Sequence, residues 1–229
     1  MKIKRKPTVA RIFVPLLLLS IILCSASCFR PSVEVVDRPL RSAPMAGNPY
    51  AMHFTHFLTK TSILQIGEEL PITISSDPYG VFADLEEGYE LRLGRFASKM
   101  EARYESADSS GGIHQGVESM ELLSLDAVSE EHYEEYSDTY GTDRAIVQSV
   151  SVPASWFSGD RGSICVLSSF SYTLTPAQST EEPTESTYSC ECVIYYIRES
   201  NRVVLFDNAV DYAAYPYVPE PQIQNEEKE

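Results

Sequence analysis

The second half of the chain consists of short runs rich in β-branched and aromatic residues, separated by turn residues. The strongest runs cover residues 145–152, 164–174, 187–198 and 202–206. Val, Ile, Thr, Tyr and Phe suit a pleated, half-buried surface, so each run predicts a strand. Ser200 and Asn201, between the last two runs, predict a tight hairpin turn. Strands do not alternate with helical segments, so a parallel sheet is not expected.

The first half carries weaker signals of the same kind. Strand-like runs cover residues 62–66, 70–75, 89–96, 99–104 and 119–125. In residues 89–96 (YELRLGRF), apolar side chains alternate with polar or small ones, which is the period-two pattern of a half-buried strand. Two segments are expected to differ. Residues 126–137 (DAVSEEHYEEYS) predict a solvated surface helix, and residues 176–186 (PAQSTEEPTES) predict an exposed loop joining two long strands.

These runs predict one all-β domain over residues 62–218. Several short strands with regularly spaced turns favour an antiparallel β-sandwich, immunoglobulin-like, with one short surface helix. A barrel has the same texture and stays as an alternative. Residues 29–61 contain Pro31, Pro39, Pro44 and Pro49 and are expected to form a linker. Residues 219–229 are charged and lack an apolar cluster, so they predict a disordered acidic tail.

Residues 1–28 have the pattern of an export signal. Five cations and no acid lie in the first eleven residues, and an uncharged, leucine-rich run follows from Ile12 to Phe29. A basic segment followed by an apolar one is typical of secretory signals. An uncleaved helix of eighteen residues would reach about 27 Å, just short of the bilayer's hydrocarbon core. The protein is therefore expected to leave the cytoplasm.

Small residues directly before a cysteine close this segment, in the order Ser25-Ala26-Ser27-Cys28. This arrangement resembles the signal of bacterial lipoproteins, although Ser25 occupies the position where those signals usually have leucine. The resemblance covers only the signal region and implies lipid attachment at Cys28 and a place on the outer face of the cell membrane. Ordinary cleavage near Cys28, giving a secreted protein, and a retained apolar anchor are the alternatives.

The charge of the chain is divided unevenly. Residues 29–229 hold 13 Lys and Arg against 33 Asp and Glu, because the other five cations lie in the signal. A domain with a net charge of −20 repels nucleic-acid phosphates and anionic lipid headgroups. Nucleic acid is therefore excluded as a partner, and solubility is the simplest reading of the acidity.

Three cysteines follow the signal: Cys165, Cys190 and Cys192. Cys190 and Cys192 lie two apart in a strand-like run and cannot easily bond to each other. A possible disulfide would therefore join Cys165 to one of them, and the alternative is that the cysteines serve as small buried side chains. A metal site built on Cys190 and Cys192 would need two further ligands at suitable spacing, and none is evident in the sequence.

No catalytic, cofactor-binding or metal-binding constellation is evident. His53 and His56 have helical spacing but lack the glutamate of a zincin helix. The acids of residues 130–138 lack the order of a calcium loop, and no Ser occupies a G-x-S-x-G elbow. The late tyrosines and Trp156 could offer binding groups or simply fill the core.

Three functions remain open. The first is an envelope binding or accessory module for a protein, peptide or glycan, without catalysis or cofactor. The alternative is an extracellular hydrolase using a carboxylate pair that sequence cannot identify. The third is a purely structural envelope protein with no ligand.

Overall fold

A computed structural model describes residues 35–45, 54–85, 87–107, 111–138, 141–177 and 182–216. The predicted signal, Cys28, His53 and the predicted tail from 219 onward lie outside these residues. The described part is an antiparallel, two-sheet β structure with one short α-helix, which confirms the predicted all-β sandwich.

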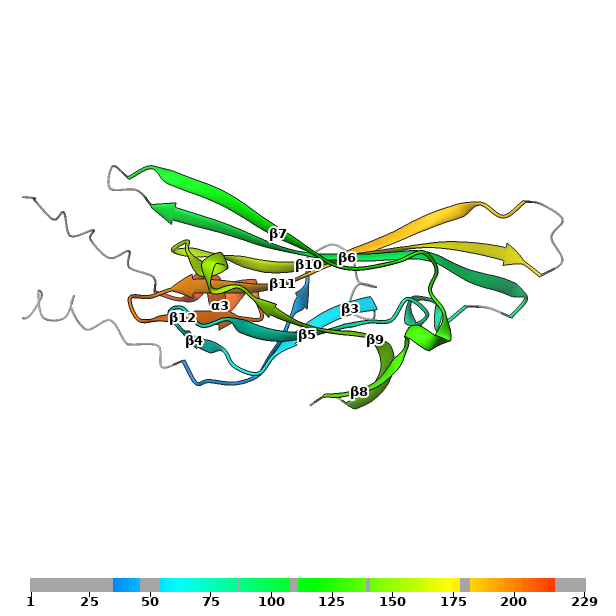
Figure 1. The fold of residues 1–229 in the computed structure, drawn as a ribbon, viewed down its shortest axis with the longest axis horizontal. Helices are drawn as coiled ribbons and strands as arrows, with labels where there is room; N and C mark the ends of the chain where they lie inside the picture. Colours follow the sequence, from blue (N-terminus) through cyan, green and yellow to red (C-terminus); the bar gives the residue numbers. More distant parts are fainter. Residues whose placement is uncertain are drawn as a thin grey trace, which may run out of the picture. The chain divides into compact units, whose positions relative to one another are not determined.

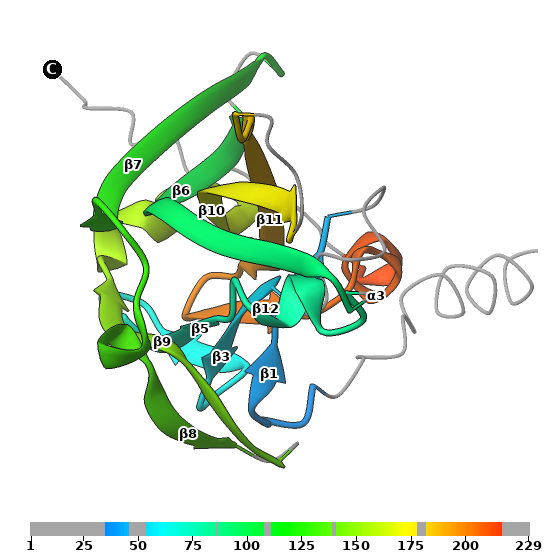
Figure 2. The same ribbon diagram turned by 90° about the vertical axis from the view of Figure 1, so that its right-hand side faces the viewer.

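The smaller sheet has five strands, all antiparallel to their neighbours (Figure 1). Its order is β1 (Leu40–Arg41), β3 (Thr55–Thr59), β5 (Leu70–Ser76), β9 (Gly141–Val152) and β8 (Glu134–Asp138). Among the described strands, β8 pairs only with β9, and these two strands extend away from the rest of the sheet (Figure 2).

The larger sheet contains the longest strands of the domain. Its order is β4 (Ile63–Gln65), β12 (Arg202–Phe206), β11 (Glu185–Arg198), β10 (Arg161–Pro176), β6 (Tyr89–Ala107) and β7 (Ile113–Leu125), with β2 (Ala43–Pro44) also paired to β11. The β6–β7 and β10–β11 hairpins point in opposite directions from the central β6–β10 pair (Figure 1).

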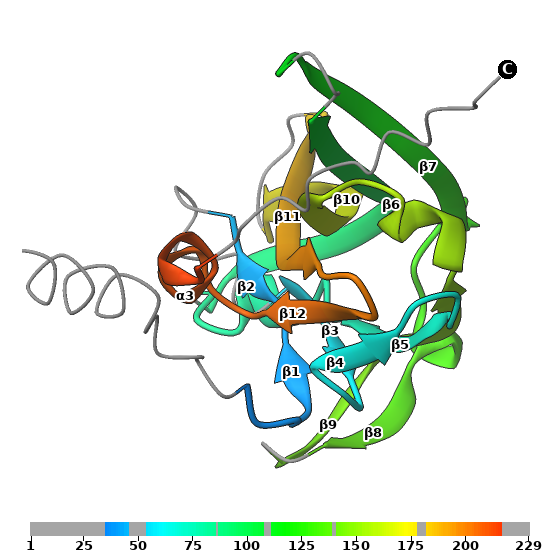
Figure 3. The same ribbon diagram turned by 90° about the vertical axis from the view of Figure 1, so that its left-hand side faces the viewer.

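The two sheets pack face to face around a shared apolar core (Figure 3). Alternate residues of each strand point inward, as Ile72 and Ile74 of β5 and Ile164 and Val166 of β10 show. A second cluster at the base of the β10–β11 hairpin is aromatic, with Phe170 at its centre. The alternation that the sequence carries therefore decides which face of each sheet is buried.

The linker prediction for residues 29–61 is wrong for its described part. Strands β1, β2 and β3 lie within it, and the alternate residues Thr55, Phe57 and Thr59 are buried. The prolines that suggested a linker fit this arrangement. Pro39 precedes β1, and Pro44 ends a two-residue edge strand, where a missing N–H is tolerated.

The predicted helix over residues 126–137 is also wrong. A single 3-10 turn, Glu130–His132, is followed directly by strand β8. The Ser129 hydroxyl lies 3.0 Å from Nδ1 of His132, which favours a tight turn. Tyr133 then contacts Tyr79, with ring centroids 5.6 Å apart, and this packing outweighs the helical propensity of the acids. The one described α-helix is α3 (Ala209–Ala214), capped by Asn208.

Candidate functional site

The outer face of the five-stranded sheet carries a row of three neighbouring side chains. Ile72 and Ile74 are buried in the core, which turns Thr73 between them to the outside. Strand register places Leu58 of β3 opposite Thr73 on one side and Ser149 of β9 opposite it on the other. The row therefore crosses three strands.

A groove of about 670 Å³ lies over this row. Its lining is mainly apolar or hydroxyl-bearing: Pro39, Leu40, Leu58, Thr59, Lys60, Pro71, Ile72, Thr73, Tyr136, Ser137, Ser149, Val150 and Ser151. Small-molecule sites typically occupy about 300–1,000 Å³, so the size suits a ligand. None of these lining residues is a carboxylate.

Two hydroxyl-bearing side chains of the groove, Thr73 and Ser149, belong to directly paired residues of β5 and β9. Directly opposed residues place their Cβ atoms about 4.5–5.5 Å apart, so the two hydroxyls can reach one ligand together. The hydroxyls of Thr59 and Ser151 are already engaged. They donate to the Thr61 carbonyl at 2.7 Å and to the Glu69 carboxylate at 2.7 Å, respectively.

Tyr136 of β8 lines the groove on the side of the β8–β9 hairpin. Its ring centroid lies 6.3 Å from that of His56 on β3, although the two strands are not adjacent in the sheet. Because Tyr136 lies in the segment expected to form a helix, no sequence signal marked it as part of a site. Its position depends on the pairing of β8 with β9, which is a long-range property.

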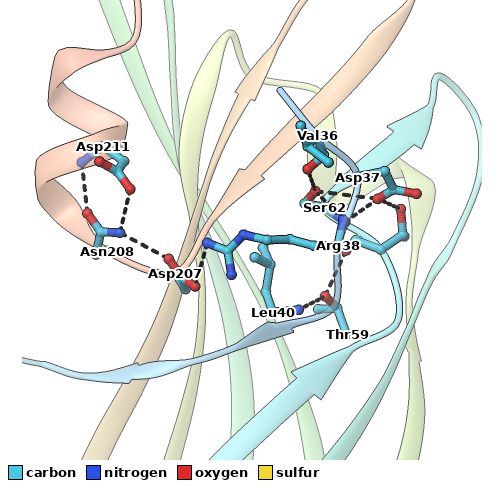
Figure 4. Close-up of polar contacts among 10 residues, drawn as sticks. Val36, Asp37, Arg38, Leu40, Thr59, Ser62, Asp207, Asn208 and Asp211 are labelled. Carbon is cyan, nitrogen blue, oxygen red and sulfur yellow. Dashed lines mark hydrogen bonds and ion pairs between the residues drawn. The ribbon is translucent and has the colours of Figure 1, made fainter. Parts of the chain in front are cut away.

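The segment before β1 is clamped to the domain by Asp37 (Figure 4). The Asp37 carboxylate accepts hydrogen bonds from the Thr61 hydroxyl at 2.6 Å and from the Ser62 backbone N–H at 2.8 Å. These donors favour the charged form and hold the pKa of Asp37 below its usual value. These two hydrogen bonds join Asp37 to residues that lie 24 and 25 positions later in the sequence. They therefore fix the path of the chain before β1.

A second set of contacts continues this clamp towards α3 (Figure 4). Arg38 forms an ion pair with Asp207 at 2.9 Å, and Asp207 accepts from the Asn208 side chain at 3.0 Å. The backbone N–H of Leu40 donates to the Thr59 hydroxyl at 3.3 Å. Since Leu40 and Thr59 both line the groove, the clamp positions one of its walls.

The possible disulfide between Cys165 and Cys190 or Cys192 is not formed in the structure, where all three are free, buried thiols. Register gives the reason. Cys165 lies opposite Val193 on the outer face of the larger sheet, whereas Cys192 lies opposite Val166 in the core. Burial raises the pKa of Cys165 to about 12 and that of Cys190 to about 11. The thiols therefore serve as small buried side chains.

The residues considered as metal ligands do not assemble into a site. His56 lies in strand β3, and its Nδ1 atom is 3.2 Å from the Arg41 guanidinium, whose charge opposes a bound cation. Glu130 of the acidic segment pairs with Arg144 at 3.0 Å. Among the described residues, no group of three or more His, Cys, Asp or Glu side chains is placed to hold a metal ion.

The aromatic residues considered as binding groups mainly fill the interior. Tyr196, Trp156 and Phe157 are buried together in the main core, with the Phe157 and Tyr196 ring centroids 5.2 Å apart. Tyr195 stacks on Tyr212 at 4.9 Å in a third cluster beneath α3. The core-filling interpretation therefore applies to these described residues.

Neither a protein-family model nor a curated protein matches the sequence. In the described part of the chain, no helix has the length and apolar character needed to cross a bilayer. The function must therefore be argued from the chemistry of the groove and from the N-terminal segment.

Proposed function

We propose that the protein is an exported module tethered at the outer face of the cell membrane, which binds a ligand in the groove of the five-stranded sheet. The groove suits an uncharged ligand with both hydroxyl groups and apolar faces, and a neutral glycan chain has this chemistry. Binding, rather than catalysis, is the proposed activity.

The observation that carries this proposal is the pair of opposed hydroxyls between apolar walls. Thr73 and Ser149 can exchange hydrogen bonds with a ligand hydroxyl, while Leu58 and Pro71 contact its apolar face. Tyr136 adds a stiff aromatic side chain, of the kind enriched in binding surfaces. A few polar groups set among apolar ones are typical of small-molecule sites.

The lining of the groove favours binding over hydrolysis. Glycoside hydrolysis usually requires two carboxyl groups about 5–10 Å apart on either side of the scissile bond. The residues that line this groove include no Asp or Glu. The hydrolase alternative therefore receives no support from the groove, although the domain is rich in acids elsewhere.

The N-terminal clamp supports a short tether. Val35 already packs against the cluster of Phe206, and Asp37 is fixed two residues later. Six residues lie between Cys28 and Val35, so the two Cα atoms can be at most about 25 Å apart when the chain is fully extended. A lipid on Cys28 would thus hold the domain close to the bilayer, on a tether shorter than the linker expected over residues 29–61.

Binding can be tested with the full chain on immobilised neutral oligosaccharides of glucose, mannose and xylose. Thr73→Trp should fill the groove and reduce binding at least tenfold. Thr187→Trp, an exposed threonine of strand β11, is the matched control and should bind like the wild type. If no neutral oligosaccharide binds, or if Thr73→Trp binds as well as the control, the groove is not a glycan site. Capture of an uncharged extended peptide in its place would assign the groove to peptides.

The tether is tested separately by labelling cells with a palmitate analogue. The wild-type chain should take up the label, and Cys28→Ala should not. An unlabelled wild-type chain would show that the protein is released or held by its apolar segment, and would leave the binding result unaffected.

A further inference from the structure

Strand β7 forms one edge of the larger sheet. It pairs with β6 along its whole length, and no described strand lies on its other side (Figures 1 and 2). Thirteen residues at about 3.4 Å each span about 44 Å. The backbone N–H and C=O groups on the free side of such a strand are a template for a strand from another chain.

The other terminal strands of the two sheets are short. Strand β1 has two residues, β4 has three and β8 has five, and short edges resist pairing with other chains. Strand β7 (IHQGVESMELLSL) also lacks Pro, Lys and Arg, which commonly protect exposed edges. The register of the β6–β7 pairing shifts between Ser98 and Lys99 of β6. Residues 113–121 of β7 lie before this shift and pair with β6 in continuous register.

Two large apolar side chains of this regular part point into solvent. Ile113 is 68% exposed and Val117 is 64% exposed, and their spacing places both on the same face of the strand. Glu118 and Glu121 are the charged residues of the strand. A pairing partner must therefore cover apolar side chains without placing a carboxylate opposite either glutamate.

We propose that a second copy of this chain pairs with β7, antiparallel, about a two-fold axis at Val117. In this register Val117 lies opposite its own copy and Gly116 lies opposite Glu118. Ile113 lies opposite Glu121, so the glutamates are never directly opposed. Centring the axis on Glu118 would oppose two like charges, which is destabilising. The symmetry closes the assembly as a dimer and joins the two larger sheets into one.

The proposal is tested by disulfide trapping of the full chain in isolated membranes under mild oxidation. Val117→Cys places two thiols directly opposite each other, about 4.5–5.5 Å apart between Cα atoms, which is a bonding distance. Ile113→Cys is the matched control, because its exposure is similar. In the proposed register, position 113 of one chain and position 113 of the other are eight residues apart along the strands, a distance of about 27 Å. Val117→Cys should give at least fivefold more covalent dimer than Ile113→Cys.

A double variant tests the register itself. Ile113→Cys combined with Glu121→Cys places thiols opposite each other again and should restore the dimer. Val117→Lys, which adds a charge on the axis, should halve the mass of the detergent-solubilised chain measured by light scattering. Equal crosslinking of Val117→Cys and Ile113→Cys would overturn the register, and a monomeric wild-type mass would overturn the dimer. Trapping of Val117→Cys on a different protein would show that β7 pairs with another partner.

Discussion

Tyr104 of β6 fills the space beside Gly116 of β7, its direct cross-strand neighbour. A Cβ atom built at residue 116 would lie 2.2 Å from Cζ of the Tyr104 ring. On the other side of Tyr104, Gly162 of β10 also has no room for a side chain. Its Cβ would lie 2.3 Å from the backbone oxygen of Arg103. The tyrosine therefore covers a strand surface that only glycine leaves open.

Replacing either glycine with alanine should destabilise the domain, but to different extents. In Gly162→Ala the new methyl group meets backbone, which cannot rotate away, so we expect a loss of about 3 kcal/mol. In Gly116→Ala it meets the far end of a side chain, and we expect about 1 kcal/mol. Urea unfolding followed by circular dichroism measures both. Equal losses would show that Tyr104 is held as rigidly as the backbone.

Glu101 should contribute to the pH dependence of stability. Lys99 Nζ donates to its carboxylate at 2.8 Å and Arg103 at 2.9 Å, and these bonds hold the pKa of Glu101 below its usual value. The folded state thus binds fewer protons than the unfolded state, so this stabilisation is present above about pH 4.3 and is lost as pH falls through the lowered pKa. The unfolding free energy of Glu101→Gln should vary less with pH in this acidic range. Glu118→Gln, an exposed residue of β7, is the control, and an equal effect there would contradict the role of the ion pairs.

The three β-strand thiols should resist alkylation in the folded protein. Cys165, Cys190 and Cys192 are buried, and burial raises the pKa of each thiol, so little reactive thiolate forms near neutral pH. Iodoacetamide at pH 8 should label them only after unfolding, with the sites identified by peptide mass spectrometry. Rapid labelling of native Cys165 would show that the outer face of the larger sheet opens to solvent.

Local patterns were sufficient for most of the fold. Strand β12 begins and ends at the predicted residues, and residues 177–184, which connect β10 to β11, fall within the loop predicted at 176–186. Other strands are longer than expected. The runs at 89–96 and 99–104 form the single strand β6, because pairing with β10 continues across the polar residues between them. Pairing between strands supplies this information, and the local sequence does not contain it.

The candidate site was not predictable in the same way. Thr73 and Ser149 are 76 positions apart and are brought together only by the pairing of β5 with β9. Leu40 belongs to a segment whose prolines suggested a linker, and Tyr136 to one whose acids suggested a helix. The absence of the possible disulfide has a related reason. Cys165 and Cys192 belong to successive residue pairs of the β10–β11 ladder, so their side chains lie on opposite faces of the larger sheet.

Phe170 should be one of the most sensitive core positions. Its ring lies 4.9 Å from that of Phe54 and 5.5 Å from that of Tyr188, measured between centroids, at the base of the β10–β11 hairpin. Phe170→Ala removes both contacts and leaves a cavity, so we expect a loss of about 3–5 kcal/mol in unfolding free energy. Phe170→Leu keeps much of the volume and should lose less than half of that. Similar losses for both would indicate that ring geometry, and not volume, stabilises this cluster.

The Asp37 clamp should control both the N-terminal segment and the groove. Asp37→Ala removes the acceptor for the Thr61 hydroxyl and the Ser62 N–H, at a cost of about 1–2 kcal/mol for the local contact. Hydrogen exchange at the Ser62 and Leu40 amides should accelerate by at least fivefold, while amides of the β6–β10 pair should keep the wild-type rate. Because Leu40 forms one wall of the groove, ligand binding should weaken in the same variant. Faster exchange throughout both sheets would instead show that Asp37 supports the whole fold, and unchanged exchange at Ser62 would show that the clamp is not formed in solution.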